Sequence, residues 1–249
     1  MNDLPVKRLA MWSGPRNIST AMMRAFENRP DCAVWDEPFY AAYLAHSGVV
    51  HPMQEEIIAD GLPNPEDVVT GLLGPTPGAE PLFYQKHMTH HMIDQVPRSW
   101  FNEVTHGFLL RHPERVTASY AAKRSDITLD DIGFPQLVEI FDQVCDVTGK
   151  APPVLDSDEV PANPKACLTA LCAAWEIPFT DAMLSWPAGR RDSDGVWADW
   201  WYGQVWRSTG FQNVPPKPIN LTAAQQNVAD AAMPHYERMR RHVLDAAAS

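Results

Sequence analysis

Short apolar runs and segments with helix-forming composition follow one another along most of this chain. Turn-forming residues bound the apolar runs, which predicts buried strands at residues 6–12, 33–36, 82–86, 107–110 and 152–156. Helices are expected at residues 19–28, 90–96, 114–123 and 165–175. Strands that alternate with helices predict a three-layer α/β fold of the P-loop type, with a parallel central sheet and helices on both faces.

Two segments interrupt this alternation. Residues 45–81 are rich in Pro, Gly and acidic residues and are expected to form an excursion above the sheet, with a short helix near Glu55. Residues 186–218 are irregular and Trp-rich, which fits either a lid or acceptor wall or aromatic core packing. Residues 222–248 are expected to form a terminal surface helix. With no internal repeat, residues 1–249 are interpreted as a single domain.

The charge balance narrows the range of partners. A formal net charge of -11 argues against general binding of nucleic acids or anionic membranes, which requires a basic surface. An anionic ligand must therefore be held by a local group of donors. The four cysteines have no metal-site spacing and are expected to be reduced, mostly buried thiols. Neither a signal peptide nor a membrane-spanning run is visible, so a cytoplasmic location is expected.

The loop after the first strand has the features of an anion site. A loop between a buried strand and a helix presents main-chain N–H groups and the positive end of the helix dipole. Arg16 adds a cation there, and Ser19 and Thr20 add hydroxyl groups. The loop is not a Walker A motif, because Asn17 and Ile18 stand where that motif has glycine and lysine. The alternative is an ordinary turn in which Ser19 caps the helix.

A second segment combines an arginine with a serine. Arg111 ends the strand expected at 107–110, and ligands of open α/β sheets bind at the carboxyl ends of strands. Ser119 would lie two turns into the helix that Pro113 opens, so both side chains could reach one phosphate. Alternatively, Arg111 pairs with a carboxylate and Ser119 has no binding role.

Together these segments resemble the P-loop sulfotransferases that use 3′-phosphoadenosine-5′-phosphosulfate (PAPS). The family's first loop, P-[KR]-S-G-[ST]-T, is similar to Pro15-Arg16-Asn17-Ile18-Ser19-Thr20, with Asn17-Ile18 in place of Ser-Gly. Its strand-ending arginine with a serine eight positions later matches Arg111 and Ser119. Weaker similarities are Glu37-Pro38-Phe39, the segment 154–159 with Asn163-Pro164, and Ile177-Pro178-Phe179.

The resemblance implies a role for each matching residue. The segment Pro15-Arg16-Asn17-Ile18-Ser19-Thr20 would hold the 5′-phosphosulfate of PAPS, and Arg111 and Ser119 would hold its 3′-phosphate. The family's late R-K-G motif is absent, and Gly189-Arg190-Arg191 is its nearest substitute. The product would be 3′-phosphoadenosine-5′-phosphate (PAP), and no metal is required.

Sulfuryl transfer should resemble phosphoryl transfer, an in-line displacement in which positioning and charge stabilisation dominate. Arg16 would neutralise the developing charge. A general base must deprotonate the acceptor. Lys86-His87 resembles the family's K-x-H segment, with the histidine one residue nearer the lysine. We expect Lys86 to belong to the catalytic group and His87 to be the base, followed by His90 and then Glu37. Alternatively, these histidines are surface groups or satisfied by other contacts.

The sequence thus predicts a sulfotransferase that acts on a hydroxyl or amine of a small-molecule acceptor. A cationic acceptor could lie against the rings of the Trp-rich segment. The first alternative is a P-loop kinase or another nucleotide-dependent phosphotransferase, and the second is a non-catalytic nucleotide-binding protein on the same fold. The acceptor's identity and the oligomeric state do not follow from the sequence.

Overall fold

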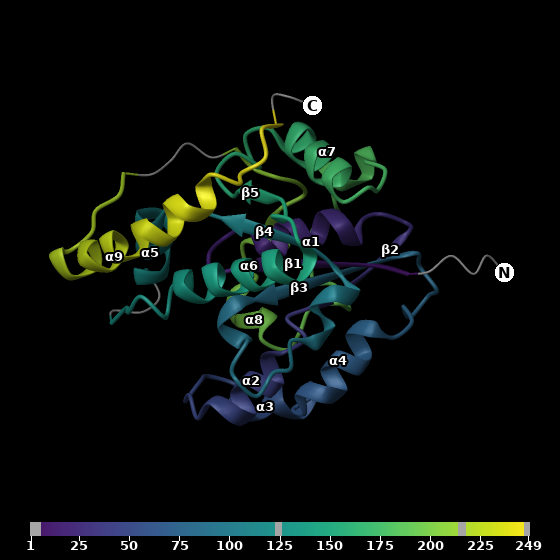
Figure 1. Ribbon diagram of the computed structural model, residues 1–249, viewed down its shortest axis with the longest axis horizontal. Helices are drawn as coiled ribbons and strands as arrows, with labels where there is room; N and C mark the ends of the chain where they lie inside the picture. The colour runs from purple at the N-terminus through teal and green to yellow at the C-terminus, as the bar shows by residue number, and fades with distance from the viewer. Residues whose placement is uncertain (1–5, 123–125, 214–217, 247–249) are drawn as a thin grey trace.

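The computed structural model describes residues 6–122, 126–213 and 218–246. Its centre is a sheet of five parallel strands in the order β2-β3-β1-β4-β5 (Figure 1). The strands are β1 (Lys7–Ser13), β2 (Cys32–Asp36), β3 (Leu82–Met88), β4 (Thr105–Leu110) and β5 (Val154–Asp156). All five predicted strands are therefore confirmed. The central position of β1 places the loop that follows it in the middle of the sheet's carboxyl edge.

The helices occupy the connections between strands and the end of the chain. They are α1 (Ser19–Glu27), α2 (Tyr40–Ser47), α3 (Gln54–Asp60), α4 (Pro65–Leu73), α5 (Pro113–Ala121), α6 (Phe134–Thr148), α7 (Pro164–Ala174), α8 (Ala198–Trp201) and α9 (Ala223–Arg240). Proline at the first turn opens α4, α5, α6 and α7, where its missing N–H costs no hydrogen bond. The predicted helices at 19–28, 114–123 and 165–175 correspond to α1, α5 and α7.

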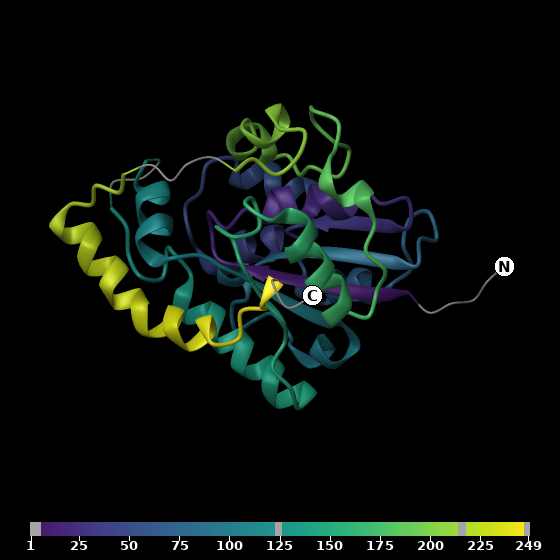
Figure 2. The same ribbon diagram turned by 90° about the horizontal axis from the view of Figure 1, so that it is seen from above.

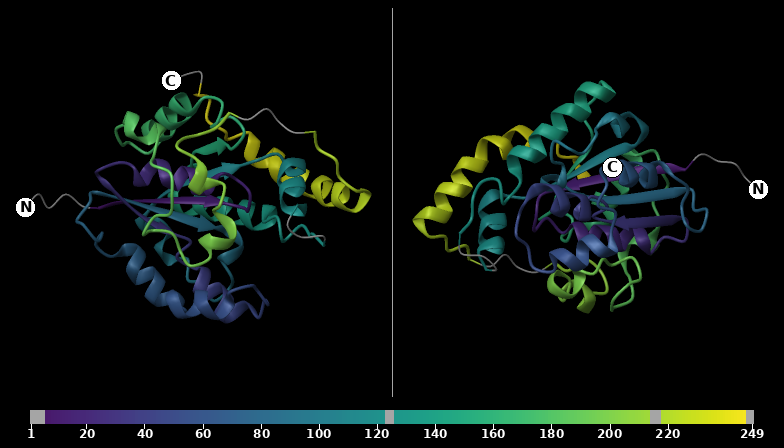
Figure 3. Two further views of the ribbon diagram at one scale, coloured as in Figure 1. Left: turned by 180° about the vertical axis from the view of Figure 1, so that it is seen from behind. Right: turned by 90° about the horizontal axis from the view of Figure 1, so that it is seen from below.

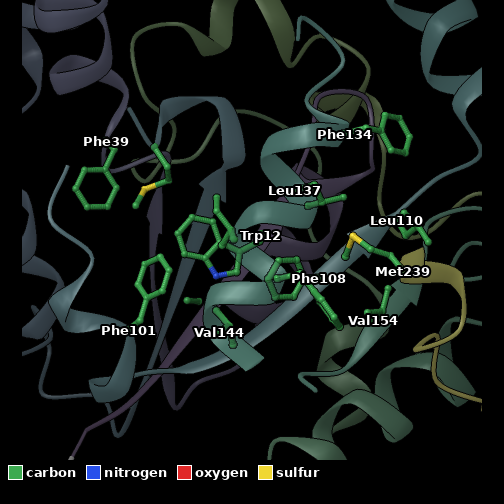
Figure 4. Close-up of a cluster of buried hydrophobic side chains, with 14 of the residues drawn as sticks. Trp12, Phe39, Phe101, Phe108, Leu110, Phe134, Leu137, Val144, Val154 and Met239 are labelled. Carbon is green, nitrogen blue, oxygen red and sulfur yellow. The ribbon is translucent and has the colours of Figure 1, made fainter. Parts of the chain in front are cut away.

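Each face of the sheet carries its own apolar cluster, because successive strand residues point to opposite faces. On one face, Trp12 lies among Phe39, Phe101, Phe108 and the apolar side of α6, as Figure 4 shows. On the other face, neighbouring β1 residues such as Met11 pack with α1 and α7. Helices thus cover both faces, which confirms the three-layer α/β fold predicted from the sequence.

The helical predictions need three corrections. No helix or strand is predicted for residues 134–148, yet they form α6, with Phe134, Leu137, Phe141 and Val144 buried along one side. The helix expected at 90–96 is only a short 3₁₀ turn, Thr89–His91. The terminal helix ends at Arg240 rather than at 248, and the last three residues lie outside the described part of the chain.

The excursion at 45–81 is more ordered than expected. The single short helix predicted near Glu55 is α3, and α2 and α4 flank it. These three helices lie together beneath the sheet in Figure 1 and again in the view from behind in Figure 3. Val68 and Leu72 of α4 are fully buried in the cluster around Trp12, so the segment packs against a face of the sheet instead of standing apart from it as an excursion.

The chain returns to the sheet after α9. This helix lies beside α5 and α6, as Figure 2 shows from above. Val243 then forms a parallel bridge with Val154 of β5, and the Leu244 N–H donates to the Val154 carbonyl at 2.9 Å. No helix of the described segments is long and apolar enough to cross a membrane. Cys32, Cys167 and Cys172 are buried free thiols, and Cys145 is a half-buried one.

Candidate functional site

Polar side chains gather where the five strands end. Arg16 follows β1, Glu37 follows β2, His90 follows β3, Arg111 follows β4 and Asp158 follows β5. All five residues line one open cavity of about 1310 Å³. Its volume exceeds that of a typical small-molecule pocket, so the cavity has room for two ligands at once. The site therefore lies at the carboxyl edge, where ligands of open α/β sheets bind.

The loop after β1 has a special backbone shape. Arg16 and Ile18 are both in the left-handed region, with φ of 63° and 54°. Such residues turn neighbouring main-chain N–H groups toward one side and create a concavity that favours anions. The Asn17 side chain holds this shape, because its amide donates to the carbonyls of Gly14 at 3.1 Å and Pro15 at 3.0 Å. The Ser157 hydroxyl donates to the Asn17 carbonyl at 3.1 Å and ties the loop to the end of β5.

Gly14 is required by the close approach of the segment before α6. A Cβ at this position would lie 2.8 Å from the Ile132 carbonyl oxygen, which is closer than real Cβ contacts. The loop continues directly into α1, whose capping residue is Ile18 and not Ser19. Ser19 and Thr20 line the cavity instead, and the first-turn N–H groups have no partner inside the helix. The anion-binding interpretation of Ser19 thus fits better than the capping interpretation.

The two motifs found in the sequence meet at this end of the cavity. The Arg16 Nε donates to Ser119 Oγ at 2.8 Å, and one Arg111 terminal nitrogen donates to the Arg16 carbonyl at 2.9 Å. Burial lowers the pKa of Arg16, and the nearby charge of Arg111 lowers it further. Asp158 accepts from Arg111 at 3.1 Å and from Arg115 at 3.2 Å. The guanidinium groups of Arg16, Arg111 and Arg115 thus line the cavity with Asp158, which leaves a positive excess. After the ligand that the sequence resemblance implies, we call this part of the cavity the nucleotide end.

A second polar group surrounds the Lys86 side chain beside Glu37. After the role that the sequence resemblance implies, we call this part of the cavity the acceptor end. The buried Lys86 ammonium donates to Asp36 Oδ1 at 2.8 Å, to Glu37 Oε1 at 2.6 Å and to the Tyr202 hydroxyl at 2.6 Å. The Tyr202 hydroxyl donates in turn to Asp36 Oδ2 at 2.7 Å. Lys86, Glu37 and Tyr202 also line the cavity.

Burial and neighbouring charges shift the pKa values of this network in opposite directions. Burial lowers the pKa of Lys86, but the charges of Asp36 and Glu37 outweigh it and hold that pKa well above its ordinary value. Burial raises the pKa of Asp36 to about 6, although the Lys86 charge opposes the shift. Lys86 therefore stays charged at neutral pH and fixes the position of the Glu37 carboxylate.

Glu37 stands out by its backbone as well as by its contacts. Its φ is 46°, in the left-handed region that non-glycine residues rarely adopt, and such residues concentrate at functional sites. The Glu37 N–H donates to the Lys86 carbonyl at 3.0 Å, which holds the turn at the end of β2. Its Oε2 lies 3.9 Å from His91 Nε2.

His87 does not reach the cavity. It follows Lys86 in β3, so the two side chains point to opposite faces of the sheet. The His87 ring stacks on Trp12 at 4.5 Å between ring centres, and only 1% of the residue is exposed. Burial lowers its pKa to about 3. This placement does not fit the expected role of His87 as the base, and the one-residue shift from the K-x-H pattern is the physical reason.

His90 and His91 both line the cavity near Glu37. Burial lowers the pKa of His90 to about 4, against the opposing charges of Glu37 and Asp131. Burial also lowers the pKa of His91 well below its ordinary value. Both rings are therefore neutral at physiological pH, and the Nδ1 atoms of both have no hydrogen-bond partner within the described residues.

The Trp-rich segment combines the two interpretations that its sequence allowed. Trp186 and Trp197 are buried in the apolar clusters, whereas Trp200 and Trp201 line the cavity. Trp200 is 55% exposed. The connection between α2 and α3 at the edge of the cavity is exposed as well, with Val50 at 88%.

A buried ion pair fastens the Trp-rich segment to α1. Arg24 of α1, which is 1% exposed, pairs with Asp194 and with Glu27. Asp194 also accepts from the Trp206 Nε1 at 2.9 Å. We call this set of contacts the latch.

Arg190 and Arg191 are not brought to the cavity. Arg190 forms an exposed ion pair with Asp199 at 2.8 Å and lies near the Trp206 ring. Arg191 lies 4.0 Å from Glu27 on α1. Neither side chain lines the cavity, so the expected cofactor contact of Gly189-Arg190-Arg191 does not fit this placement.

Several lining residues were not identified from the sequence. Arg115 and Asp158 form the ion pairs around Arg111, and Tyr40, Tyr43 and Asp131 line the acceptor end. Arg115 lies in the first turn of α5, four residues after Arg111, so its closeness in sequence to that arginine could have indicated it. No group of three or more His, Cys, Asp or Glu residues in the described segments could hold a metal ion.

A family model described as a sulfotransferase domain matches residues 7–243. Two relatives from Arabidopsis thaliana, branched-chain-amino-acid aminotransferase-like proteins 2 and 1, are 33% identical over 236 residues and 34% identical over 232 residues. Each alignment covers 93% of this chain but 41% of the relative. The chain thus spans less than half the length of these curated relatives, and their names describe the longer proteins.

Solved structures share the fold at low sequence identity. The sulfotransferase domain of the Synechococcus PCC 7002 olefin synthase superposes with a TM-score of 0.53 at 14% identity, covering 93% of this chain and 96% of that domain. A sulfotransferase from Alicyclobacillus acidocaldarius gives 0.54 at 12% identity, covering 96% and 97%. The sulfotransferase domain of the curacin biosynthetic pathway gives 0.51 at 14% identity, covering 92% and 98%.

Proposed function

This chain belongs to the sulfotransferase domain family, and from that membership we propose that it transfers the sulfuryl group of PAPS to a hydroxyl or amine of a small-molecule acceptor. The observation that carries the choice of PAPS is the meeting of Arg16, Arg111 and Ser119 beside the start of α1. A second anion-binding group next to the first distinguishes a nucleotide with a 3′-phosphate from ATP. We propose a cytoplasmic location.

The nucleotide end offers donor groups for both anionic parts of PAPS, the 5′-phosphosulfate and the 3′-phosphate. The N–H groups from Arg16 to Thr20, the start of α1 and the Arg16 guanidinium would hold the 5′-phosphosulfate. Arg111 and Ser119 would hold the 3′-phosphate, with Arg115 near it. Asp158 aligns two of these arginines before any ligand arrives. PAPS supplies an activated sulfuryl group on a good leaving phosphate.

Glu37 is the general base that the geometry favours. It lines the cavity at the end of β2, and Lys86 holds its Oε1, which leaves Oε2 for the acceptor. The acceptor oxygen forms the new bond to sulfur while the bond to the bridging phosphate oxygen breaks, and Glu37 receives the hydroxyl proton. Arg16 stabilises the charge that develops on the leaving phosphate.

His90 is the second choice for the base, because it lines the same end of the cavity. Its pKa of about 4 makes it a weak base at neutral pH. Lys86 is a positioning residue, since its three hydrogen bonds leave no donor for a substrate. Parallel loss of turnover in Glu37→Gln and His90→Gln would indicate a shared role.

Calorimetric titration with PAP, adenosine 5′-phosphate and ATP with magnesium tests the proposal. We expect PAP to bind with micromolar or tighter affinity, and the other two nucleotides to bind much more weakly. ATP binding more tightly than PAP would contradict the proposal and support a phosphotransferase. Tight PAP binding without turnover on any acceptor would support a non-catalytic nucleotide-binding protein.

A further inference from the structure

The acceptor end of the cavity has the opposite charge from the nucleotide end. Within the described residues, Lys86 is the cation of this end. It pairs with Asp36 and Glu37, and Asp130 and Asp131 add two further carboxylates to the cavity lining. The histidines there add no positive charge, because burial keeps His90 and His91 neutral. A ligand that binds here therefore meets a negative excess.

Asp131 is the acidic group that is independent of the Lys86 network. It lies in the loop before α6, where its Oδ2 accepts from the Thr128 N–H at 2.8 Å and from the Thr128 hydroxyl at 2.7 Å. Its charge acts on His90, and the charge of Glu37 acts on the same ring. Carboxylates from two different segments thus act on one neutral ring at the cavity wall.

His91 supplies an unused hydrogen-bonding atom. Only 2% of this residue is exposed, it lines the cavity, and its Nδ1 has no partner within the described residues. When the proton is on Nε2, which lies 3.9 Å from Glu37 Oε2, Nδ1 carries a lone pair. A buried acceptor atom without a donor is costly, so a donor from a ligand would stabilise it.

Aromatic rings complete the walls of the acceptor end. Tyr40 and Tyr43 stack on His91 with ring centres 4.4 Å and 5.0 Å away. Both tyrosines line the cavity, as do Trp201 and Tyr202 of the Trp-rich segment. Electron-rich ring faces attract cations, and the attraction increases where water is excluded.

We infer that the acceptor carries a positively charged nitrogen, such as a primary ammonium, in addition to the hydroxyl that receives the sulfuryl group. Ammonium N–H groups would donate to the carboxylates and to His91 Nδ1, and the aromatic rings would surround the charge. An anionic acceptor would face repulsion from Glu37 and Asp131. This inference rests on the proposed function in that it treats this end as the acceptor site.

Three phenols of similar size and different charge test the inference. Tyramine carries an ammonium, 4-propylphenol is neutral, and 3-(4-hydroxyphenyl)propionate carries a carboxylate. We expect tyramine to bind at least about tenfold more tightly than the propionate, with 4-propylphenol between them. Calorimetric titrations are made with and without saturating PAP. The preference should weaken as the salt concentration rises.

The variant Asp131→Asn sharpens the test, because asparagine keeps the volume and can still accept from Thr128. Its preference for tyramine over the propionate should fall by about threefold or more. The matched control Asp94→Asn removes the same charge at an exposed position outside the cavity lining and should keep the full preference.

The titrations distinguish failure of the cationic-acceptor inference from failure of the proposed sulfotransferase function. If PAP binds but tyramine and the propionate bind equally, the cationic acceptor is ruled out while the proposed function stands. If PAP fails to bind but the preference for tyramine persists and depends on Asp131, the proposed function fails and the cationic subsite remains. Equal changes in Asp131→Asn and Asp94→Asn would also overturn the inference.

Discussion

The two ends of the cavity are built in different ways. The nucleotide end uses main-chain N–H groups at the start of α1 and arginines that are partly exposed, with Arg111 and Arg115 sharing Asp158. The acceptor end uses side chains that are almost completely buried, among them Lys86, Asp36 and His91. A site of the first kind depends on local backbone geometry, whereas a site of the second kind depends on compensation between buried charges. Changes at the two ends should therefore have different consequences.

The largest expected effect is acid sensitivity caused by the buried histidines. Burial lowers the pKa of His87 to about 3 and those of His90 and His106 to about 4, from an ordinary value of 6.5. As the pH falls below 6.5, the unfolded chain binds protons that the folded chain does not, so the folded state loses stability. The loss is about 1.4 kcal/mol per pH unit for each histidine.

Asp36 opposes this loss, because its pKa is raised to about 6 and the folded state gains its proton first. We expect a net loss on the order of 5 kcal/mol between pH 7.5 and pH 5. Denaturant unfolding at both pH values measures it. His87→Phe should reduce the acid sensitivity, whereas the exposed control His46→Gln should not. A flat profile in the wild type would show that the rings are not buried as described.

The second prediction concerns Lys86→Met. This change leaves Asp36 buried with Tyr202 as its remaining donor, and the free energy of unfolding should fall by about 3–5 kcal/mol at pH 8. The loss should be smaller at pH 5, because protonated Asp36 needs no countercharge. Adding Asp36→Asn should restore part of the stability. A fully stable single variant would contradict the role of Lys86 in the buried network.

The third prediction separates catalysis from binding at the acceptor end. Glu37→Gln keeps the side-chain volume but removes the base, so turnover should fall by roughly a hundredfold or more. PAP affinity should stay within about twofold, because Glu37 lies outside the nucleotide end. Rates measured with saturating PAPS and acceptor test this expectation. Near-normal turnover would move the role to His90.

The smallest of the four effects belongs to the nucleotide end. Arg111→Ala should weaken PAP binding by about 1.5–3 kcal/mol, the range for a charge-assisted hydrogen bond. Stability should change little, because Asp158 keeps Arg115 as its partner. Arg190→Ala is the matched control and should leave PAP affinity unchanged, since Arg190 lies outside the cavity lining. Equal effects of the two variants would show that net charge matters more than position.

The parts of the site that could be predicted from the sequence are residues that directly follow a strand or directly precede a helix. Arg16 follows a buried strand and precedes a helix, and Arg111 ends another strand. In a parallel sheet the carboxyl ends of all strands lie at one edge, so these residues come close together even when the exact strand boundaries are not known. The contact between Arg16 and Ser119 at 2.8 Å follows from that rule.

Successive side chains of a strand point to opposite faces, which explains why His87 does not reach the cavity as expected. The resemblance to K-x-H pointed to a histidine near Lys86, but adjacent strand residues face opposite sides, so one residue of shift moved the ring onto Trp12. This signal was present in the sequence. The apolar spacing of α6, with Phe134, Leu137 and Phe141 on one side, is likewise a helical pattern that can be seen in the sequence.

Other features depend on contacts between distant segments. Tyr202 reaches Asp36 across 166 positions of the chain, and Asp194 reaches Arg24 across 170. Neither local composition nor spacing indicates such pairs. Arg190 and Arg191 were placed by similarity to a motif alone, and a motif without a known strand or helix before it does not fix where a side chain points.

The latch between Arg24 and Asp194 has a consequence for product release. It joins the Trp-rich segment to α1, the helix that continues directly from the loop after β1. Trp200 and Trp201, which line the cavity, should therefore move together with that loop, and lifting the Trp-rich segment to release a product would require breaking a buried ion pair. Among the described residues, no buried ion pair holds Val49 and Val50 between α2 and α3, so we expect ligands to exchange past these two helices.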